Sequence, residues 1–350
     1  MALVYRNKDG LQEIGGIKVV DSFKYLGVKI GGDRDIFKMH KQEIETGLEG
    51  KAGRLRRVVE KSYNRVEVGK MWWKNGIVPG LLHGIGVMEV GKGLIEKMQK
   101  VEYRVYRQLL GAAGYAPLAV IRGEIGTSLV KTRVMSARIM LVKGMIEGEN
   151  KLVKDILGKV RELEGYGWNR TLDRYLEEVG MTFEDIGRMS KGEIKRRIKE
   201  YDTGCWWREL GGLRSVDVYR EFKLGIGYDR PYDNGMESVL LFKARSNTLI
   251  LGDRNRFRGG DGICELCRQE VEDIGHFILR CPGVRRARRA ELLEKLGGEG
   301  DGERLGRMLF TGGRVGEVRR MLGDMWRLRY CRMVRVRRER GEEPLGVLSC

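Results

Sequence analysis

The chain has 350 residues, enough for two or three domains with a buried core. Its hydrophobic fraction of 41% is typical of a globular protein and excludes a disordered one. The formal net charge of +18 favours a polyanionic partner, most often nucleic acid. An arginine-rich coding bias, or membership of a larger neutral protein, would also explain this charge.

Several classes of protein are excluded by local composition. Glycine is frequent, at 51 residues, but has no three-residue period, so the chain is not collagen-like. The N-terminal residues MALVYRNKDG contain no signal peptide, and no stretch approaches the ~20 apolar residues of a membrane span. We therefore expect a nuclear or cytoplasmic protein that is not secreted and has no membrane partner. Its cysteines are then thiols or metal ligands, with Cys205, Cys331 and Cys350 as packing or tail residues.

The first 32 residues predict β-structure. Residues 17–30, IKVVDSFKYLGVKI, are β-branched and aromatic and indicate two short strands with a turn near Asp21 and Ser22. Residues 2–5 could form another strand.

From residue 35 onward the patterns are mostly helical. A charged helix is predicted over 35–59, and a second over 69–77 is expected to break at Pro79 and Gly80. A clean helical spacing runs from Leu94 to Leu109 and stops at Gly111. The next helix carries an apolar stripe and, on its predicted outer side, a set of cations. The stripe is Val130, Val134, Ala137, Leu141 and Met145, and the cations are Lys131, Arg133, Arg138 and Lys143.

The second half of the chain predicts shorter helices. Those over 150–200 are interrupted by glycines, and TFED at 182–185 marks a helix start. We expect a loop or domain junction at Trp206 and Trp207 and a short helix near 236–244. A helix is predicted over 285–296, and arginines occupy its first turns. Their positive charge is unfavourable at the positive end of the helix dipole, and a bound anion would relieve this repulsion. A basic helix at about 315–340 ends the pattern.

The stretch CELCRQEVEDIGHFILRC has the spacing C-x2-C-x8-H-x4-C. Cys264, Cys267, His276 and Cys281 are four ligands of the kind that bind one tetrahedral zinc ion. Four ligands close the coordination shell, which predicts a structural ion, whereas the alternative is chance spacing without a metal. Residues five apart lie about 140° off one face of a regular α-helix, so we expect the turn to loosen near Cys281.

A segment this small buries little apolar area, so a metal ion would supply much of its folding free energy. The ordered segment would then fix the arginines on both sides of the cluster, where they can bind phosphates. These arginines are Arg245, Arg254, Arg256, Arg258, Arg280, Arg285, Arg286, Arg288 and Arg289.

Several segments together resemble the C-terminal half of reverse transcriptases from non-LTR (LINE-type) retrotransposons. They are SFKYLGVKI at 22–30, VPGLLHG at 78–84, RQLLGAAGYAPLAVIRGEIG at 107–126, and the cysteine–histidine cluster followed by PGVRRARR. The resemblance implies that Lys24 and Tyr25 lie in a hairpin that supports the primer end. It also implies a helical thumb that clasps template–primer duplex and a zinc knuckle that binds RNA or DNA.

The chain departs from the family in three places. No Tyr-x-Asp-Asp pattern is present, so we expect no polymerase activity from the chain itself, although the parent protein would be an RNA-directed DNA polymerase. No nuclease pattern of acids and lysine follows the cluster. His83 stands where the family often has tyrosine, and we expect it to be a packed core residue.

The predicted fold is mainly α. Its segments are a β-hairpin (1–32), a thumb-like helical domain (33–150), a helical connector (151–240), a zinc-knuckle region (241–300) and a basic C-terminal helix (301–350). The leading hypothesis is a nucleic-acid-binding part of a reverse transcriptase that lacks the catalytic palm. The alternatives are a zinc-stabilised protein-interaction module and a retrotransposon relic without function.

Overall fold

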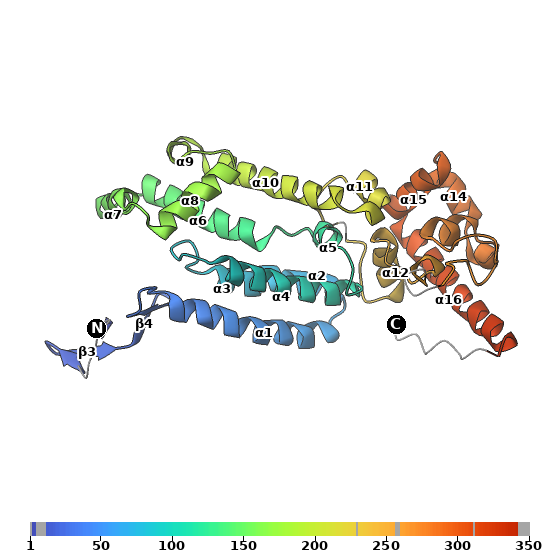
Figure 1. Ribbon diagram of the computed structural model, residues 1–350, viewed down its shortest axis with the longest axis horizontal. Helices are drawn as coiled ribbons and strands as arrows, with labels where there is room; N and C mark the ends of the chain where they lie inside the picture. Colours follow the sequence, from blue (N-terminus) through green and yellow to red (C-terminus); the bar gives the residue numbers. More distant parts are fainter. Residues whose placement is uncertain (1, 5–11, 229, 256–259, 311, 342–350) are drawn as a thin grey trace. The chain divides into compact units, whose positions relative to one another are not determined.

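The computed structural model describes residues 2–4, 12–228, 230–255, 260–310 and 312–341, and it is mainly helical (Figure 1). The chain forms two compact units. Unit 1 comprises residues 1–60, 69–105 and 128–205, and unit 2 comprises 61–68, 106–127 and 206–350. These units cut across the five consecutive segments expected from the sequence, because residues 33–150 contribute to both.

Two small sheets precede the helices in unit 1. Strand β3 (Ile17–Val20) pairs in parallel with β1 (Ala2–Val4) and antiparallel with β2 (Glu13–Ile14). Strands β4 (Ser22–Tyr25) and β5 (Val28–Gly31) form the predicted N-terminal hairpin. The break expected near Asp21 and Ser22 separates β3 from β4, whereas the hairpin turn itself lies at Leu26 and Gly27, where φ is 45° and 87°. A turn with positive φ at both central residues matches the right-handed twist of the strands.

The helices of unit 1, and those that it shares with unit 2, follow in chain order. They are α1 (Lys38–Glu60), α2 (Arg65–Met71), the π-helix η1 (Trp72–Ile77), α3 (Val78–Leu82), α4 (Lys92–Leu110), α6 (Val130–Glu147), α7 (Lys151–Glu162), α8 (Gly167–Glu178), α9 (Phe183–Arg188) and α10 (Lys191–Gly211).

The remaining elements belong to unit 2. They are α5 (Leu118–Ile125), η2 (Arg214–Val216), α11 (Asp217–Phe222), α12 (Met236–Arg245), α13 (Gly252–Asn255), the π-helix η4 (His276–Arg280), the 3₁₀ helix η5 (Pro282–Ala287), α14 (Ala290–Leu296), α15 (Gly300–Phe310), η6 (Gly312–Arg314) and α16 (Val315–Glu339).

Several predicted helix boundaries are confirmed. Gly111, with φ of 62°, follows the end of α4. Thr182 caps α9 in a reciprocal capping box with Asp185. Trp206 marks the boundary between the two units, as expected, although it lies within helix α10 rather than in a loop.

Two predicted features of the helices are wrong. The break expected at Pro79 does not occur. The π-helix η1 continues directly into α3, and Pro79 lies in the first turn of α3, just after the widened turn. The helix expected over 285–296 is divided into η5 and α14, because Arg288 and Arg289 have extended backbones.

Two of the four cations on the predicted outer side of α6, Arg138 and Lys143, are buried, whereas Lys131 and Arg133 are partly exposed. The guanidinium of Arg138 is fully buried and donates to the carbonyl oxygens of Gly86, Met88 and Trp168. It also lies 5.4 Å from the ring centroid of Trp168. The carbonyls and the aromatic ring compensate for the loss of water around the charge, so that an arginine can occupy a core position.

The histidine prediction is also wrong. His83 is exposed, and its Nε2 lies 2.7 Å from the carbonyl oxygen of Leu26 in the β4–β5 turn. Of the two histidines outside the cysteine cluster, His40 on α1 is the buried one, at 7% exposure.

In the described part of the chain, no helix has both the length and the apolar character needed to cross a membrane.

Candidate metal centre

Cys264, Cys267, His276 and Cys281 converge in unit 2. One ligand atom from each of them lies within 4.8 Å of those from the other three. Cys264, His276 and Cys281 are fully buried, and Cys267 is half-buried. The four residues that the spacing predicts as ligands are therefore brought together.

The local backbone explains how His276 and Cys281 share one side of a helical turn. Residues His276–Arg280 form a π-helix, and the Cys281 N–H donates to the carbonyl oxygen of His276 at 2.6 Å. An i→i+5 hydrogen bond widens the turn and places the fifth residue above the first. The loosened turn expected near Cys281 is thus a π-turn, which directs both side chains to the cluster.

Two distances within the cluster match the edges of a tetrahedral zinc site. The Sγ atoms of Cys264 and Cys281 are 3.8 Å apart, and Cys267 Sγ lies 3.4 Å from His276 Nε2. Zn–S bonds of about 2.3 Å imply an S–S edge of about 3.8 Å, and a Zn–N bond of about 2.0 Å implies an S–N edge of about 3.5 Å. The arrangement is compatible with a zinc site, and its four donors fill a tetrahedral shell.

The thiols are prepared for ligation by hydrogen bonds. Backbone N–H groups of Leu266 and Cys267 point to the Cys264 sulfur, and that of Gly283 points to the Cys281 sulfur. The hydrogen bond between Cys264 and Cys281 lowers the pKa of the Cys281 thiol and, with burial, raises that of Cys264. Without a metal, one thiolate is therefore stabilised by a neighbouring thiol, while a bound cation would stabilise both.

Acidic residues around the cluster position His276. Asp273 accepts a hydrogen bond of 2.6 Å from the His276 backbone N–H. A Glu270 carboxylate oxygen lies 3.5 Å from His276 Nδ1, the ring nitrogen that faces away from the sulfurs. The ion pair with Arg280 holds the pKa of Glu270 below its ordinary range, so the carboxylate is charged. A carboxylate behind a ligating histidine helps to orient the ring.

Helix α16 holds this segment through two arginine–glutamate pairs. Arg329 binds the buried Glu272 with two hydrogen bonds of 2.7 Å. Arg337 binds Glu265, which lies between the first two cysteines, at 2.9 and 3.2 Å. Residues eight apart lie about 80° apart around an α-helix, so the two arginines share one broad face, and α16 contacts the segment along two turns. Glu265 and Glu272 therefore anchor the metal segment to α16.

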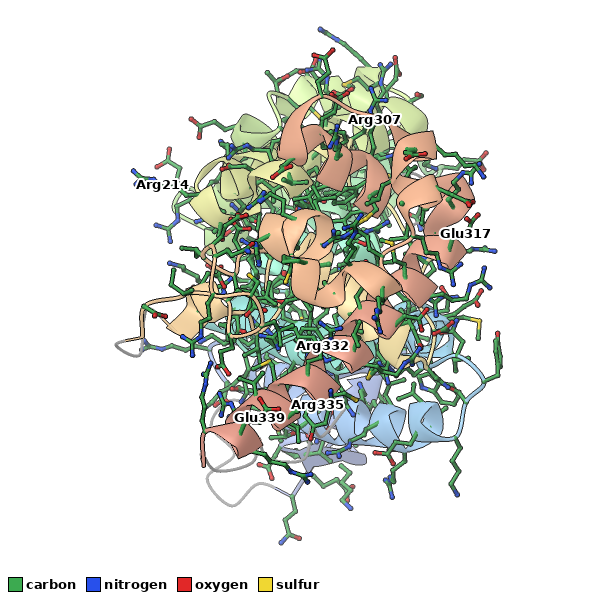
Figure 2. The ribbon with its side chains drawn as sticks, turned by 90° about the vertical axis from the view of Figure 1, so that its right-hand side faces the viewer. Arg214, Arg307, Glu317, Arg332, Arg335 and Glu339 are labelled. Carbon is green, nitrogen blue, oxygen red and sulfur yellow. The ribbon has the colours of Figure 1, made fainter. Side chains whose placement is uncertain are left out.

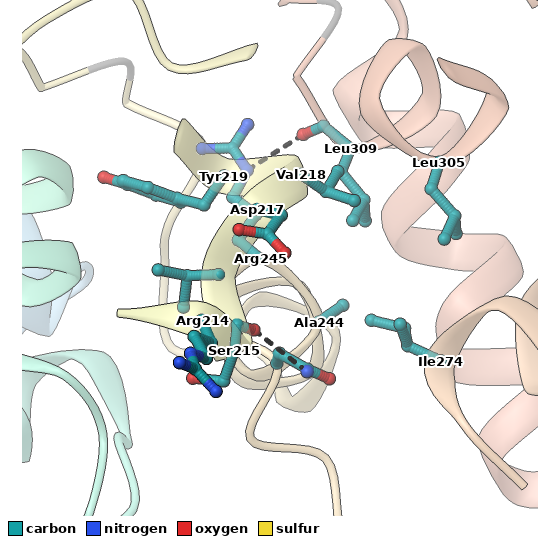
Figure 3. A pocket seen from close by; sticks show the side chains of 12 residues that line it. Arg214, Ser215, Asp217, Val218, Tyr219, Ala244, Arg245, Ile274, Leu305 and Leu309 are labelled. Atoms are coloured by element: carbon teal, nitrogen blue, oxygen red, sulfur yellow. Dashed lines mark hydrogen bonds between the residues drawn. The ribbon is translucent and has the colours of Figure 1, made fainter. Parts of the chain in front are cut away.

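Arg245 does not face solvent, so the expectation that it contacts nucleic acid is wrong. Its guanidinium is buried and binds the Glu124 carboxylate at 2.7 Å and the Leu309 carbonyl oxygen at 2.8 Å. Figure 3 shows this side chain beside a pocket of about 210 Å³, which is also lined by Asp217 and Leu305. The guanidinium of Arg245 on one wall of the pocket already donates to Glu124 and Leu309, so it is a weak candidate for binding a ligand there.

Three other predicted contacts already have partners. Arg288 donates to the carbonyl oxygens of Ile278 and Cys281 at 2.8 and 2.7 Å, so it supports the π-turn. Arg280 pairs with Glu270 and Asp301, and Arg254 lies over the Tyr115 ring, 5.6 Å from its centroid.

The remaining predicted contacts are exposed or not described. Arg285 and Arg286 are exposed on η5 and have no acidic partner among the described residues. Arg289 is exposed and lies 3.8 Å from Asp324. Arg256 and Arg258 lie outside the described residues. Lys24 and Tyr25 are exposed on strand β4 of unit 1.

The structure adds three arginines that the sequence reasoning did not single out. Arg332, Arg335 and Arg338 recur every three residues on α16, and none of them has an acidic partner in the described ranges. Figure 2 shows Arg332 and Arg335 on the same side of this helix. Their i, i+3 spacing in the sequence is a pattern that could have identified them as neighbours on one helix.

Comparisons of the chain with protein-family models, curated proteins and solved structures give no match.

Proposed function

We propose that unit 2 binds RNA or DNA through arginines held in place around a structural zinc ion. The observation that carries this proposal is the set of arginines without acidic partners among the described residues, beside a metal-ligand cluster. They are Arg285, Arg286, Arg332, Arg335 and Arg338.

The contrast between paired and unpaired arginines supports a polyanionic partner. On α16, Arg329 and Arg337 pair with glutamates of the metal segment. Arg332, Arg335 and Arg338, on the same helix, have no acidic partner among the described residues. Guanidinium groups on an ordered helix can bind phosphate oxygens with two hydrogen bonds at little further entropic cost. Phosphate contacts would dominate, so binding should be insensitive to base sequence and steeply dependent on salt.

The zinc ion would be held by Cys264, Cys267, His276 and Cys281 and would supply folding free energy to the segment between residues 262 and 289. A closed four-ligand shell leaves no coordination position for a substrate, which supports a structural ion. Together with the resemblance of residues 22–30 and 264–289, this supports a non-catalytic part of a retrotransposon reverse transcriptase.

The proposal is tested by fluorescence anisotropy with labelled single-stranded RNA, single-stranded DNA and an RNA–DNA duplex at two salt concentrations. Replacing Arg332, Arg335 and Arg338 together by alanine should weaken binding at low salt at least tenfold. The slope of log affinity against log salt should fall by roughly 2–3, one released counterion for each lost contact.

The matched control removes the same charge elsewhere. Arg196, Arg197 and Lys199 are exposed on the part of α10 that belongs to unit 1. Their triple alanine variant should retain most of the affinity. Equal losses in both variants would reduce the effect to net charge, and salt-insensitive binding or no binding to any probe would refute the proposal. Capture of an acidic protein, with no affinity for nucleic acid, would favour an interaction module.

A further inference from the structure

Helix α7 of unit 1 carries an apolar surface that the fold leaves uncovered. Leu152 is 65% exposed and Ile156 is 48% exposed, and they lie one helical turn apart. Leu163, which follows the helix, is 54% exposed, and Tyr166 is 45% exposed. Large exposed apolar side chains that gather on one helix and on the residues directly after it are a feature of interaction surfaces, unlike single exposed leucines.

A shallow apolar groove adjoins this surface. It has a volume of about 150 Å³, and its lining includes Leu141 and Met145 of α6, Val160 of α7, and Tyr166. All of these residues belong to unit 1. An apolar side chain from a partner could therefore enter the groove while the partner's helix covers Leu152 and Ile156.

The charges next to the apolar surface indicate what kind of partner fits. Lys151, Asp155 and Lys159 form an i, i+4 row that lies beside the row of Leu152 and Ile156. All three are exposed. Lys151 and Asp155 have no ion-pair partner in the part of the chain that the structure describes, and Lys159 forms only an exposed pair with Glu162 at 3.0 Å.

The charges of this row complement those of the same row on a second, antiparallel copy of α7. If two copies of α7 cross antiparallel at the level of Leu157, Asp155 of each copy lies opposite Lys159 of the other. The same alignment brings Lys151 of each copy near Glu162 of the other, while Leu152 approaches Leu163. A parallel alignment would place like charges opposite each other, which disfavours it.

We propose that α7 forms an antiparallel, two-fold symmetric interface with α7 of a second copy of this chain. Two-fold contacts are self-complementary by necessity, and this surface meets that condition in both its charges and its apolar residues. The interface is small, so the dimer belongs to the weak class and its population should depend on concentration.

The test is sedimentation equilibrium of the full chain, freed of nucleic acid, over a concentration series. The parent mass should rise from 40.0 kDa towards twice that value. Asp155→Lys alone, or Lys159→Asp alone, should weaken association by about tenfold, because each change creates two repulsive contacts across the axis. Ile156→Glu should abolish the association.

A mixing experiment isolates the antiparallel geometry. Chains carrying only Asp155→Lys have two lysines at these positions, and chains carrying only Lys159→Asp have two aspartates. At a concentration where the parent is mostly dimeric, each variant alone should be shifted towards monomer. An equimolar mixture should form a heterodimer there, and the double variant within one chain should recover the parent affinity. A fold defect in either variant would prevent this recovery, so rescue separates loss of the interface from loss of structure.

Ile250→Glu is the matched control, because Ile250 is 61% exposed in unit 2 and should not affect association. A parent chain that stays monomeric throughout the series would overturn the proposal. Association of Asp155→Lys as strong as that of the parent, or a mixture no more associated than its components, would also overturn it.

Discussion

Helix α6 and the metal segment, residues 262–289, reach fixed structures by different physical means. Helix α6 is held by apolar packing, with Val134, Ile139 and Val142 fully buried and Arg138 compensated by carbonyl oxygens. The metal segment buries few apolar side chains, among them Phe277 and Ile278. It depends instead on four ligands and on the two arginine–glutamate pairs with α16. The packed helix distributes its stability over many contacts, whereas the metal segment concentrates it in one site.

Metal removal should separate the two regions most clearly. Chelation, or His276→Ala, should release the backbone of residues 262–289, because structural zinc contributes about 10–16 kcal/mol of apparent binding free energy in small domains. Hydrogen exchange should report lost protection there and unchanged protection in α6. Cys331→Ser is the control, because Cys331 is exposed and outside the cluster. Unchanged exchange after complete zinc removal would show that the ion has no structural role.

Arg138→Met should have the next largest effect, and it should act on the other region. It removes the donor to Gly86, Met88 and Trp168, and we expect unfolding of unit 1 to become easier by about 3–5 kcal/mol. Zinc content should not change. Arg174→Met is the control, because Arg174 is exposed and contacts the Tyr175 side chain from the surface, so its change should be small. Equal stability of both variants would contradict the role given to the buried guanidinium.

Gly283→Ala should disturb the metal segment without removing a ligand. A Cβ at this position would lie 2.7 Å from Leu266 Cβ and 3.4 Å from Cys281 Sγ, so the two ends of the segment would have to separate. We expect a loss of about 1–3 kcal/mol in a competition titration for zinc. Gly204→Ala in α10 has open space and should instead stabilise its helix by about 0.5–1 kcal/mol. Unchanged zinc affinity in Gly283→Ala would refute the close approach.

The smallest effect is expected at the more exposed of the two arginine–glutamate pairs that join α16 to the metal segment. Arg337→Ala removes the pair with Glu265, which is half-buried, and should decrease the protection of the segment by about 0.5–1.5 kcal/mol. Arg329→Ala should decrease it more, because it leaves Glu272 buried without its cation. Hydrogen exchange of both variants in the zinc-loaded state measures this order. The reverse order would refute the claim that these pairs hold the segment to α16.

The sequence predicts features that local spacing determines and misses those that depend on distant partners. The four ligands, the capping box at Thr182 and the stop at Gly111 follow from short patterns, and the structure has them. The burial of Arg138 and Arg245 depends on carbonyls and a carboxylate that lie 30 or more residues away. A helical pattern contains no trace of such partners, so both arginines were expected on the surface.

The central claim is that four side chains hold one zinc ion that orders the segment carrying the unpaired arginines. X-ray absorption at the zinc edge, together with metal analysis of the purified chain, tests it most directly. The account predicts one zinc per chain, with three sulfur neighbours at about 2.3 Å and one nitrogen at about 2.0–2.1 Å. No bound zinc in the parent chain, or a shell of oxygen neighbours, would contradict it.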